Sequence, residues 1–420
     1  MTTKHVAILV FPGYGHVNPT LEISRCLTAL GHRVTYVLDE RFAAPVAEAG
    51  AALVPYTSRR GRLGARNHMT GEDIGALGLA VLRESMEAIL PLTLEAFEDD
   101  VPDLVLYDLE SFFTARAAAA RWDRPTVQLF PYFASNEHYS LNREVFDGAT
   151  DHVHRCIELV QEYLTDRGED PDAVWTFMAN SDERNLVLLP RELQPYGETF
   201  GERYTFTGHS LRTDRPGTGS WSPPPGDGPV ALITLGTEVN DRPDFFAACG
   251  AAFADGGWHL VMTVGPGNLP GGRAPVSAAN VETYEWLPFN TVLPHVSAVV
   301  CHSGMSTMLE AVSFGKPLVV VTYTPEDRVN ARRITELGLG VELPGTEVTA
   351  GRLREAVETV ANDPGIRRRL ERMRMNMLAA GGPSRAALLI DGWLREPSPG
   401  SGETVRHAVP AAVSESAGVR

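Results

Sequence analysis

Hydrophobic residues in the first half of the chain gather in short continuous runs instead of alternating with polar ones. Such runs occupy residues 6–11, 34–38, 104–107 and 126–130. Continuous apolar runs of this length are typical of strands buried on both faces, as in a parallel sheet. We therefore predict four parallel strands at these positions.

Helical patterns lie between these strands. Residues 21–30 carry apolar side chains at helical spacing, and Gly31 follows as a typical helix end. A second helix is predicted over 114–121, whereas residues 12–18, rich in glycine, proline and asparagine, are predicted to form a loop. Alternation of strands and helices indicates a doubly wound α/β domain.

A second series of strands follows a stretch rich in proline, glycine and serine, which we interpret as an interdomain linker. The new apolar runs cover 230–235, 258–264, 298–301 and 318–322. A chain of 420 residues is also long for one core, which favours two domains. The predicted organisation is an N-terminal domain 1–211, a linker 212–229, a C-terminal domain 230–383, a helix 384–395 and a flexible tail 396–420, with a polar, mobile loop at 57–73.

Charge and cysteine content exclude several classes of protein. The net charge of −16 disfavours binding to nucleic acid or to an anionic membrane, so a phosphate ligand would need local backbone dipoles. The four cysteines are scattered and show neither a disulfide framework nor zinc spacing. Without a secretory signal or an apolar stretch of ~18 residues, the chain is expected to be soluble and cytoplasmic.

Two polar residues follow predicted strands of the first domain. His16 comes after the first strand and Asp108 after the run 104–107, so both are expected at the same edge of the sheet. A neutral imidazole can take a proton from a hydroxyl, and a carboxylate on its other nitrogen fixes its tautomer. The alternative is structural: a histidine that only forms hydrogen bonds and an aspartate that caps a helix.

The glycines near His16 permit another interpretation. Gly13 and Gly15 before a helix resemble a dinucleotide-binding fingerprint, with Asp39 as the ribose-binding acid. The third glycine of that motif is Asn18 here, and the imidazole would occupy the place of the pyrophosphate. The fingerprint is therefore incomplete.

The segment 299–317 predicts an anion site. A strand ends at Cys301, and a helix is predicted to begin near Met305 and to stop before Gly315. Free amides and the dipole at such a helix start attract a diphosphate, and Glu310 projects one turn later, where it could hold ribose hydroxyls. Serine and threonine capping of an ordinary strand–helix unit is the alternative.

Other candidates flank this segment. Trp286, at a strand end, could stack on a nucleobase or belong to the core. Glu326 and Asp327 could accept hydrogen bonds from sugar hydroxyls or cap the next helix. Aromatic residues after the strands of the first domain could line an apolar acceptor cleft or be core, with acceptor contacts assigned to Phe112, Phe130, Phe133 and His138.

Together these motifs resemble the family-1 glycosyltransferases, in their bacterial macrolide glycosyltransferase-like branch. The resemblance spans residues 6 to about 394 and rests on the N-terminal motif Gly13-x-Gly15-His16-x-Asn18-Pro19 and on a C-terminal block. That block comprises Trp286-x-Pro288, His302-x-Gly304, Ser306-Thr307, Glu310-Ala311, Gly315-x-Pro317 and Asn330-Ala331.

The resemblance implies a GT-B fold, in which two Rossmann-like domains face each other across a cleft, and an enzyme that transfers sugar. It implies His16 as general base with Asp108 behind it. It further implies a donor site made of Gly236, Thr237, Trp286, His302, Gly304, Ser306, Thr307, Glu310, Glu326, Asp327 and Asn330.

The expected activity is inverting transfer of a hexose to a hydroxyl of a macrolide or polyphenol, without metal or cofactor and by a monomer or homodimer. Asp170-Pro171-Asp172 is interpreted as a surface loop and not as a metal motif. UDP-glucose is the expected donor, but Glu326-Asp327 replaces the family's Asp-Gln pair and Phe289 follows Pro288 where many members have Gln, so a dTDP-deoxysugar stays open. The alternatives are a nucleotide-sugar 2-epimerase, a nucleotide-sugar sensor and an NAD-dependent oxidoreductase.

Overall fold

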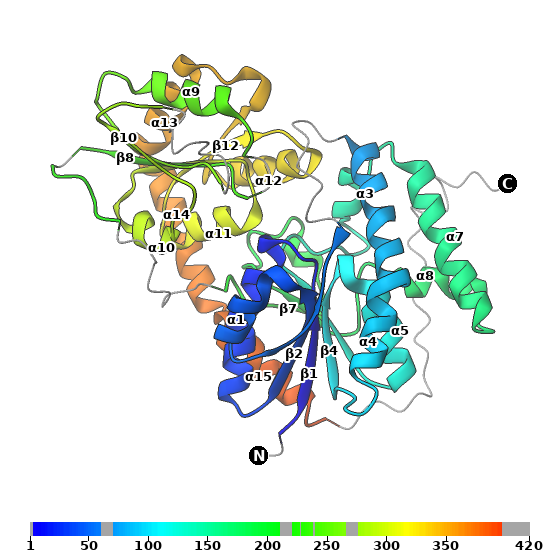
Figure 1. Cartoon of the computed structure of the whole chain (residues 1–420). Helices are drawn as coiled ribbons and strands as arrows, with labels where there is room; N and C mark the ends of the chain where they lie inside the picture. Colours follow the sequence, from blue (N-terminus) through cyan, green and yellow to red (C-terminus); the bar gives the residue numbers. More distant parts are fainter. Residues whose placement is uncertain are drawn as a thin grey trace.

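The computed structural model describes residues 3–59, 70–210, 221–226, 228–237, 240–265 and 276–396. These residues form two α/β lobes, each built on one parallel sheet, which confirms the predicted fold class (Figure 1). Most of the predicted loop 57–73, more than half of the linker 212–229 and nearly all of the tail 396–420 lie outside the described residues. Among the described helices, none is both long and apolar enough to cross a bilayer.

The N-lobe contains a seven-stranded sheet with the order β3-β2-β1-β4-β5-β6-β7. Its strands are β1 His5–Leu9, β2 Arg33–Asp39, β3 Ala52–Tyr56, β4 Leu104–Asp108, β5 Thr126–Phe130, β6 Asn185–Val187 and β7 Tyr204–Phe206. All neighbouring pairs are parallel. The central strands β1 and β4 are buried along their whole length, as their continuous apolar runs predict.

The C-lobe contains a six-stranded parallel sheet with the order β10-β9-β8-β11-β12-β13. Its strands are β8 Val230–Thr234, β9 His259–Thr263, β10 Val281–Tyr284, β11 Ala298–Cys301, β12 Leu318–Thr322 and β13 Gly340–Pro344. In each lobe the strand order reverses once, between β1 and β4 and between β8 and β11. Ligands of doubly wound sheets bind at the carboxyl ends of strands at such a switch point.

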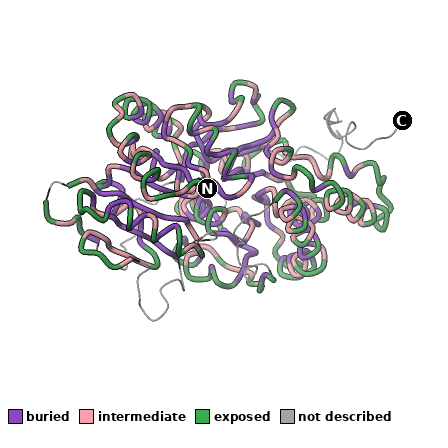
Figure 2. Tube along the Cα trace, turned by 90° about the horizontal axis from the view of Figure 1, so that it is seen from above, coloured by how far each residue is buried: buried purple, intermediate pink, exposed green. Residues whose placement is uncertain are grey.

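The helices cover both sheets. Those before the linker are α1 Tyr14–Ala29, α2 Ala43–Glu48, α3 Gly71–Glu84, α4 Leu90–Ala96, α5 Phe112–Trp122, α6 Leu141–Val145, α7 Thr150–Asp166 and α8 Val174–Phe177. Those after it are α9 Pro243–Ala252, α10 Phe289–Val292, α11 Met305–Ser313, α12 Pro325–Glu336, α13 Ala350–Asn362, α14 Pro364–Ala379 and α15 Gly382–Trp393. Figure 2 shows buried chain gathered inside both lobes and exposed chain on their outer turns.

The first helix differs from the prediction, because most of the expected loop at 12–18 is already helical. Gly13 is extended, with φ −116° and ψ 145°, and serves as the N-cap of α1. Pro19 lies inside this helix, where its fixed φ suits the helical backbone, but it donates no amide hydrogen bond and its ring crowds the carbonyl of Gly15. His16 therefore occupies the first turn of a helix and is held more rigidly than a loop residue.

Among the described residues, several contacts join the lobes. Figure 1 shows α14 and α15 passing from the C-lobe to the N-lobe, where Ala386, Ala387 and Ile390 of α15 enter the core beside α1. At another contact, the guanidinium of Arg333 on α12 donates hydrogen bonds to the carbonyls of residues 192, 193 and 194 at 2.8, 2.8 and 3.1 Å. These contacts fix the sides of the cleft relative to each other.

Candidate active site

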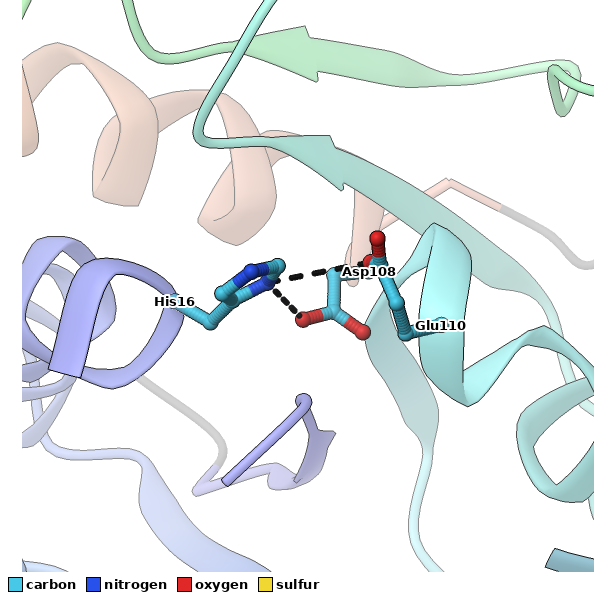
Figure 3. A group of neighbouring side chains, drawn as sticks. All are labelled: His16, Asp108 and Glu110. Atoms are coloured by element: carbon cyan, nitrogen blue, oxygen red, sulfur yellow. Dashed lines mark hydrogen bonds and ion pairs between the residues drawn. The ribbon is translucent and has the colours of Figure 1, made fainter. Parts of the chain in front are cut away.

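The switch point of the N-lobe brings His16 and Asp108 together. His16 Nδ1 lies 2.8 Å from Asp108 Oδ2 (Figure 3). Asp108 ends β4 and is fully buried, and its carboxylate accepts the backbone N–H groups of Phe11 at 2.8 Å and Ser111 at 3.1 Å. Because an aspartate oxygen only accepts, His16 donates from Nδ1, which leaves Nε2 as the nitrogen that can take a proton.

A second carboxylate lies beside the same imidazole nitrogen. Glu110 Oε2 is 3.7 Å from His16 Nδ1, and the Tyr132 hydroxyl donates a hydrogen bond of 2.8 Å to that oxygen (Figure 3). The sequence analysis did not select Glu110. Its position two residues after Asp108, at the end of the same strand, was the available signal.

These charges change the titration of His16. Burial alone would lower the pKa of its imidazole, but the Glu110 and Asp108 carboxylates outweigh burial and raise the pKa to about 9. Burial raises the pKa of Glu110, which His16 partly offsets. Glu326 of α12, in the other lobe, adds to the negative potential at His16. At neutral pH most of the resting protein therefore holds His16 protonated.

His16, Asp108 and Glu110 are also the group among the described residues that is compact enough for metal ligands, with ligand atoms within 4.8 Å of one another. Their contacts are those of a hydrogen-bonded set, since Asp108 Oδ2 already accepts from both His16 and the Phe11 amide. We therefore assign the group to proton handling. The Asp170-Pro171-Asp172 segment is a turn in which Asp170 accepts the amide of Asp172 at 2.9 Å.

The switch point of the C-lobe holds a second imidazole between two glycines. His302 follows β11, and a Cβ added to Gly236 or Gly304 would lie 2.5 or 2.8 Å from His302 Cε1. Gly236 also has a φ of +67°, which favours glycine. Glycine at both positions is thus what allows His302 to lie against the backbone at the carboxyl ends of β8 and β11.

The loop after His302 is strained and held from α12. Ser303 is fully buried and has a φ of +62°, which is rare for a residue with a side chain. Its hydroxyl donates to the Asp327 carbonyl at 3.0 Å and carboxylate at 3.1 Å, and Asn330 Nδ2 donates to its carbonyl at 3.0 Å. These bonds keep the entry into α11 in one conformation.

The N-terminus of α11 faces the N-terminus of α1 across the cleft. Gly304 is the N-cap of α11 and provides no side-chain cap, so the first amides of the helix are left for another acceptor. A Cβ on Gly15 of α1 would lie 3.9 Å from Ser306 Oγ. That hydroxyl is buried and has no hydrogen-bond partner among the described residues. Two positive helix ends and an unsatisfied hydroxyl make an anion site here.

Further donor candidates line the same cleft. Trp286 is 46% exposed on its wall, and Thr237 follows β8 at its floor. Burial raises the pKa of Glu310 to about 7. Glu326 is open to the cleft, yet the surrounding protein and the Asp327 carboxylate raise its pKa to about 7 as well. Both carboxylates are therefore only partly ionised at neutral pH.

The cleft between the lobes is large, with a volume of about 2560 Å³. Ordinary small-molecule pockets measure roughly 300–1,000 Å³, so this one has room for two substrates. Its N-lobe side carries an apolar wall made by α3, α7 and the segment between them. The wall comprises Ile74, Leu77, Val81, Phe112, Phe146 and Ile157, of which the sequence analysis selected only Phe112.

Known proteins match this chain over nearly its whole length. Residues 264–390 match the family model of the erythromycin biosynthesis protein CIII-like C-terminal domain. The demethyllactenocin mycarosyltransferase of Streptomyces fradiae is 37% identical over 93% of this chain and 86% of its own length. The oleandomycin glycosyltransferase of Streptomyces antibioticus is 34% identical over 93% of this chain and 91% of its own. The crystal structure of CalG4, the calicheamicin glycosyltransferase, has a TM-score of 0.82 at 38% identity and covers 95% of this chain and 100% of its own.

The chain is a family-1 glycosyltransferase with the GT-B fold. It belongs to the bacterial macrolide glycosyltransferase branch, as the sequence motifs indicated. Within this glycosyltransferase, His16 and most predicted donor residues line a single cleft, and the buried Asp108 lies behind His16.

Two of the predicted acceptor contacts of the glycosyltransferase are wrong. Phe130 and Phe133 are each 1% exposed and belong to the core, where Phe130 packs near Tyr204 and Phe133 near Tyr139. Phe112 and His138 do line the cleft. The pattern of aromatic residues could not separate these cases, because the helices that form the cleft wall come from other parts of the chain.

Two of the predicted donor residues take part in structural hydrogen bonds. Asp327 is the N3 residue of a capping box on α12, and its carboxylate accepts the amides of Tyr323 at 3.0 Å and Thr324 at 2.9 Å. Asn330 is 2% exposed and bonds to Ser303. Both hold the strained loop at Ser303, and Asp327 also lines the cleft, as does the exposed Glu326.

Proposed function

We propose that this glycosyltransferase moves a hexose from a nucleoside diphosphate to a hydroxyl of a small hydrophobic natural product, with inversion at the anomeric carbon. The observation that carries the proposal is the position of His16. Its Nδ1 is bound to the buried Asp108, and it lies in the same cleft as the amide-rich start of α11. A base and an anion site on opposite walls suit an in-line displacement.

The proposed reaction is a single displacement. His16 Nε2 takes the proton of the acceptor hydroxyl while the acceptor oxygen forms a bond to the anomeric carbon. The bond from that carbon to the diphosphate oxygen breaks, and its electron pair leaves with the diphosphate. Asp108 stabilises the imidazolium that forms.

Anchoring of the leaving group requires no metal in this scheme. The amides at the start of α11, with Ser306 and Thr307 in its first turn, would receive the diphosphate beside His302. Trp286 would stack on the base and Glu310 would accept the ribose hydroxyls. The chelator arm of the experiment below tests this directly.

The donor is proposed to be a UDP- or dTDP-hexose, with UDP-glucose first. Glu326 is the carboxylate that faces the sugar site, and it replaces an aspartate of the common family pair. The acceptor is proposed to be a macrolide- or polyphenol-like molecule that lies on the apolar wall of α3 and α7. The names of the similar enzymes, which act on demethyllactenocin, oleandomycin and calicheamicin, point to the same class.

The experiment is a matrix of nucleotide sugars against acceptors, read by mass spectrometry. A gain of one sugar mass, release of nucleoside diphosphate only with acceptor, an inverted anomer by NMR and unchanged rates with a chelator are expected. Diphosphate release without acceptor would indicate an epimerase-like or hydrolytic reaction, and chelator-sensitive transfer would contradict anchoring by amides.

A further inference from the structure

Two carboxylates, not one, lie beside Nδ1 of His16. Asp108 Oδ2 is at 2.8 Å and Glu110 Oε2 at 3.7 Å, and they come from the end of β4 and from the turn that follows it. Figure 3 shows both carboxylates on the same side of the imidazole. A His–Asp dyad needs only the Asp108 carboxylate to fix the tautomer of the His16 imidazole.

Glu110 is held in place by another residue. The Tyr132 hydroxyl donates to Glu110 Oε2 at 2.8 Å, and the Tyr132 ring stands edge-on to the His16 ring with centroids 5.6 Å apart. Tyr132 follows β5, the strand next to β4. Three strands that are neighbours in the sheet, β1, β4 and β5, thus end at this arrangement.

We propose that Glu110 is a positioning residue that sets the basicity of His16, with Tyr132 holding its carboxylate beside Nδ1. Glu110 stabilises the imidazolium after the acceptor proton has arrived at Nε2. It also stabilises the imidazolium before the acceptor binds. His16 is therefore a stronger base, but at neutral pH it is mostly protonated already and cannot accept the acceptor proton. This proposal rests on the proposed role of His16 in transfer.

Two other carboxylates act on His16. Asp108 is buried and bound to two backbone amides, and Glu326 of α12 acts on His16 from the C-lobe. Glu110 is 35% exposed in its side chain, so a neutral amide can replace it without creating a buried unpaired charge. Glu110→Gln is therefore the informative substitution.

The first test compares pH profiles of kcat/KM for the wild type and Glu110→Gln. An opposite charge within ~4–6 Å shifts a pKa by about 1–3 units. In Glu110→Gln the acidic limb of the profile, where kcat/KM rises with pH, should therefore shift to lower pH by about one unit. The two profiles should then cross, with the variant equal or faster near neutral pH and slower at alkaline pH. Simple structural damage would lower the rate at every pH and leave the limb in place.

Two further variants test the Tyr132 hydrogen bond and provide a control. Tyr132→Phe should move the limb in the same direction by less, because Glu110 loses a hydrogen bond that favours its ionised form. Glu198→Gln is the matched control, since Glu198 is exposed, lies outside the cleft lining and is not among the charges acting on His16. Its profile should coincide with that of the wild type.

The second test does not depend on transfer. NMR of the imidazole nitrogens, with the His16 signals identified by their loss in His16→Ala, gives the titration midpoint of His16 directly in the full chain. A midpoint lower by about one unit in Glu110→Gln supports the proposal. An equal midpoint in wild type and variant overturns it, even if His16→Ala is inactive. Conversely, a shifted midpoint together with an active His16→Ala would overturn the proposed role of His16 and leave the role of Glu110 in its titration intact.

Discussion

The two lobes place the same structural feature on opposite sides of one cleft, a histidine at the switch point of a parallel sheet. In the N-lobe, His16 is surrounded by the carboxylates of Asp108 and Glu110. In the C-lobe, His302 lies between Gly236 and Gly304, beside the open amides of α11. The fold thus fixes where each imidazole stands, whereas the neighbouring residue types give it different surroundings, carboxylates in one lobe and glycines with open helix amides in the other.

The largest expected effect comes from removing the imidazole of the N-lobe. His16→Ala should lower kcat/KM by about 10²–10⁴-fold, the usual contribution of a general base, while nucleotide binding to the C-lobe persists. Steady-state transfer rates and calorimetric binding of the nucleoside diphosphate would measure the two parts. His295→Ala changes an exposed histidine of the C-lobe outside the cleft lining and is the control. Equal losses of binding and transfer in His16→Ala would break the division between the lobes.

The next effect is a dependence on pH that arises in the N-lobe alone. Because the pKa of His16 is raised to about 9, kcat/KM should rise about tenfold per pH unit from pH 7 to 8 and level off above 9. The raised pKa of His16 also adds to the free energy of unfolding. This stabilisation is fully present at pH values below the ordinary histidine pKa of about 6.5 and is lost as the pH rises through about 9. A rate that is already constant from pH 6.5 upward would contradict the assigned environment of His16.

On the C-lobe side, the exposed indole is expected to contribute to nucleotide affinity. Stacking of a base on an aromatic side chain is worth about 1–3 kcal/mol, so Trp286→Ala should raise the donor KM by roughly 5–150-fold with a small change in kcat. Trp286→Phe should recover part of this loss. Donor titrations at saturating acceptor measure the effect. An unchanged donor KM for Trp286→Ala would show that Trp286 does not contact the nucleotide.

The smallest of these effects concerns the glycines that surround the second imidazole. In Gly304→Ala the new Cβ would lie 2.8 Å from His302 Cε1, so the ring has to move. Strain of about 1–3 kcal/mol at this point should raise the donor KM by around tenfold and leave the titration of His16 unchanged. Gly351→Ala, on α13 with nothing within 4 Å, should be neutral or slightly stabilising. A Gly304→Ala protein with unchanged donor KM would show that His302 is free to move.

The sequence predicted the central strands of both sheets because strands buried on both faces have few polar positions, as in β11. It did not predict β3, β6, β7 and β13, which are partly exposed or only three residues long. It misplaced the start of α1, because glycine and proline near residue 16 suggest a loop when read locally. Phe130 and Phe133 were taken for acceptor contacts, since an aromatic residue has the same pattern in a core and in a cleft.

Contacts between segments that are distant along the chain could not be predicted from the sequence pattern either. Glu110 meets His16 only through the pairing of β1 with β4, and Asn330 meets Ser303 only because α12 packs against β12, the strand next to β11. The apolar wall of α3 and α7 likewise depends on two helices that are separated by five helices and strands along the chain.

The most direct test is a crystal structure with a nucleoside diphosphate bound, since both switch points could in principle receive it. The division of roles predicts the diphosphate at the amides of α11, between Gly304 and Thr307, with the base on Trp286 and His16 Nε2 facing it across the cleft. A diphosphate bound instead at Gly13 and Gly15 of the N-lobe, in the manner of a dinucleotide, would contradict the account.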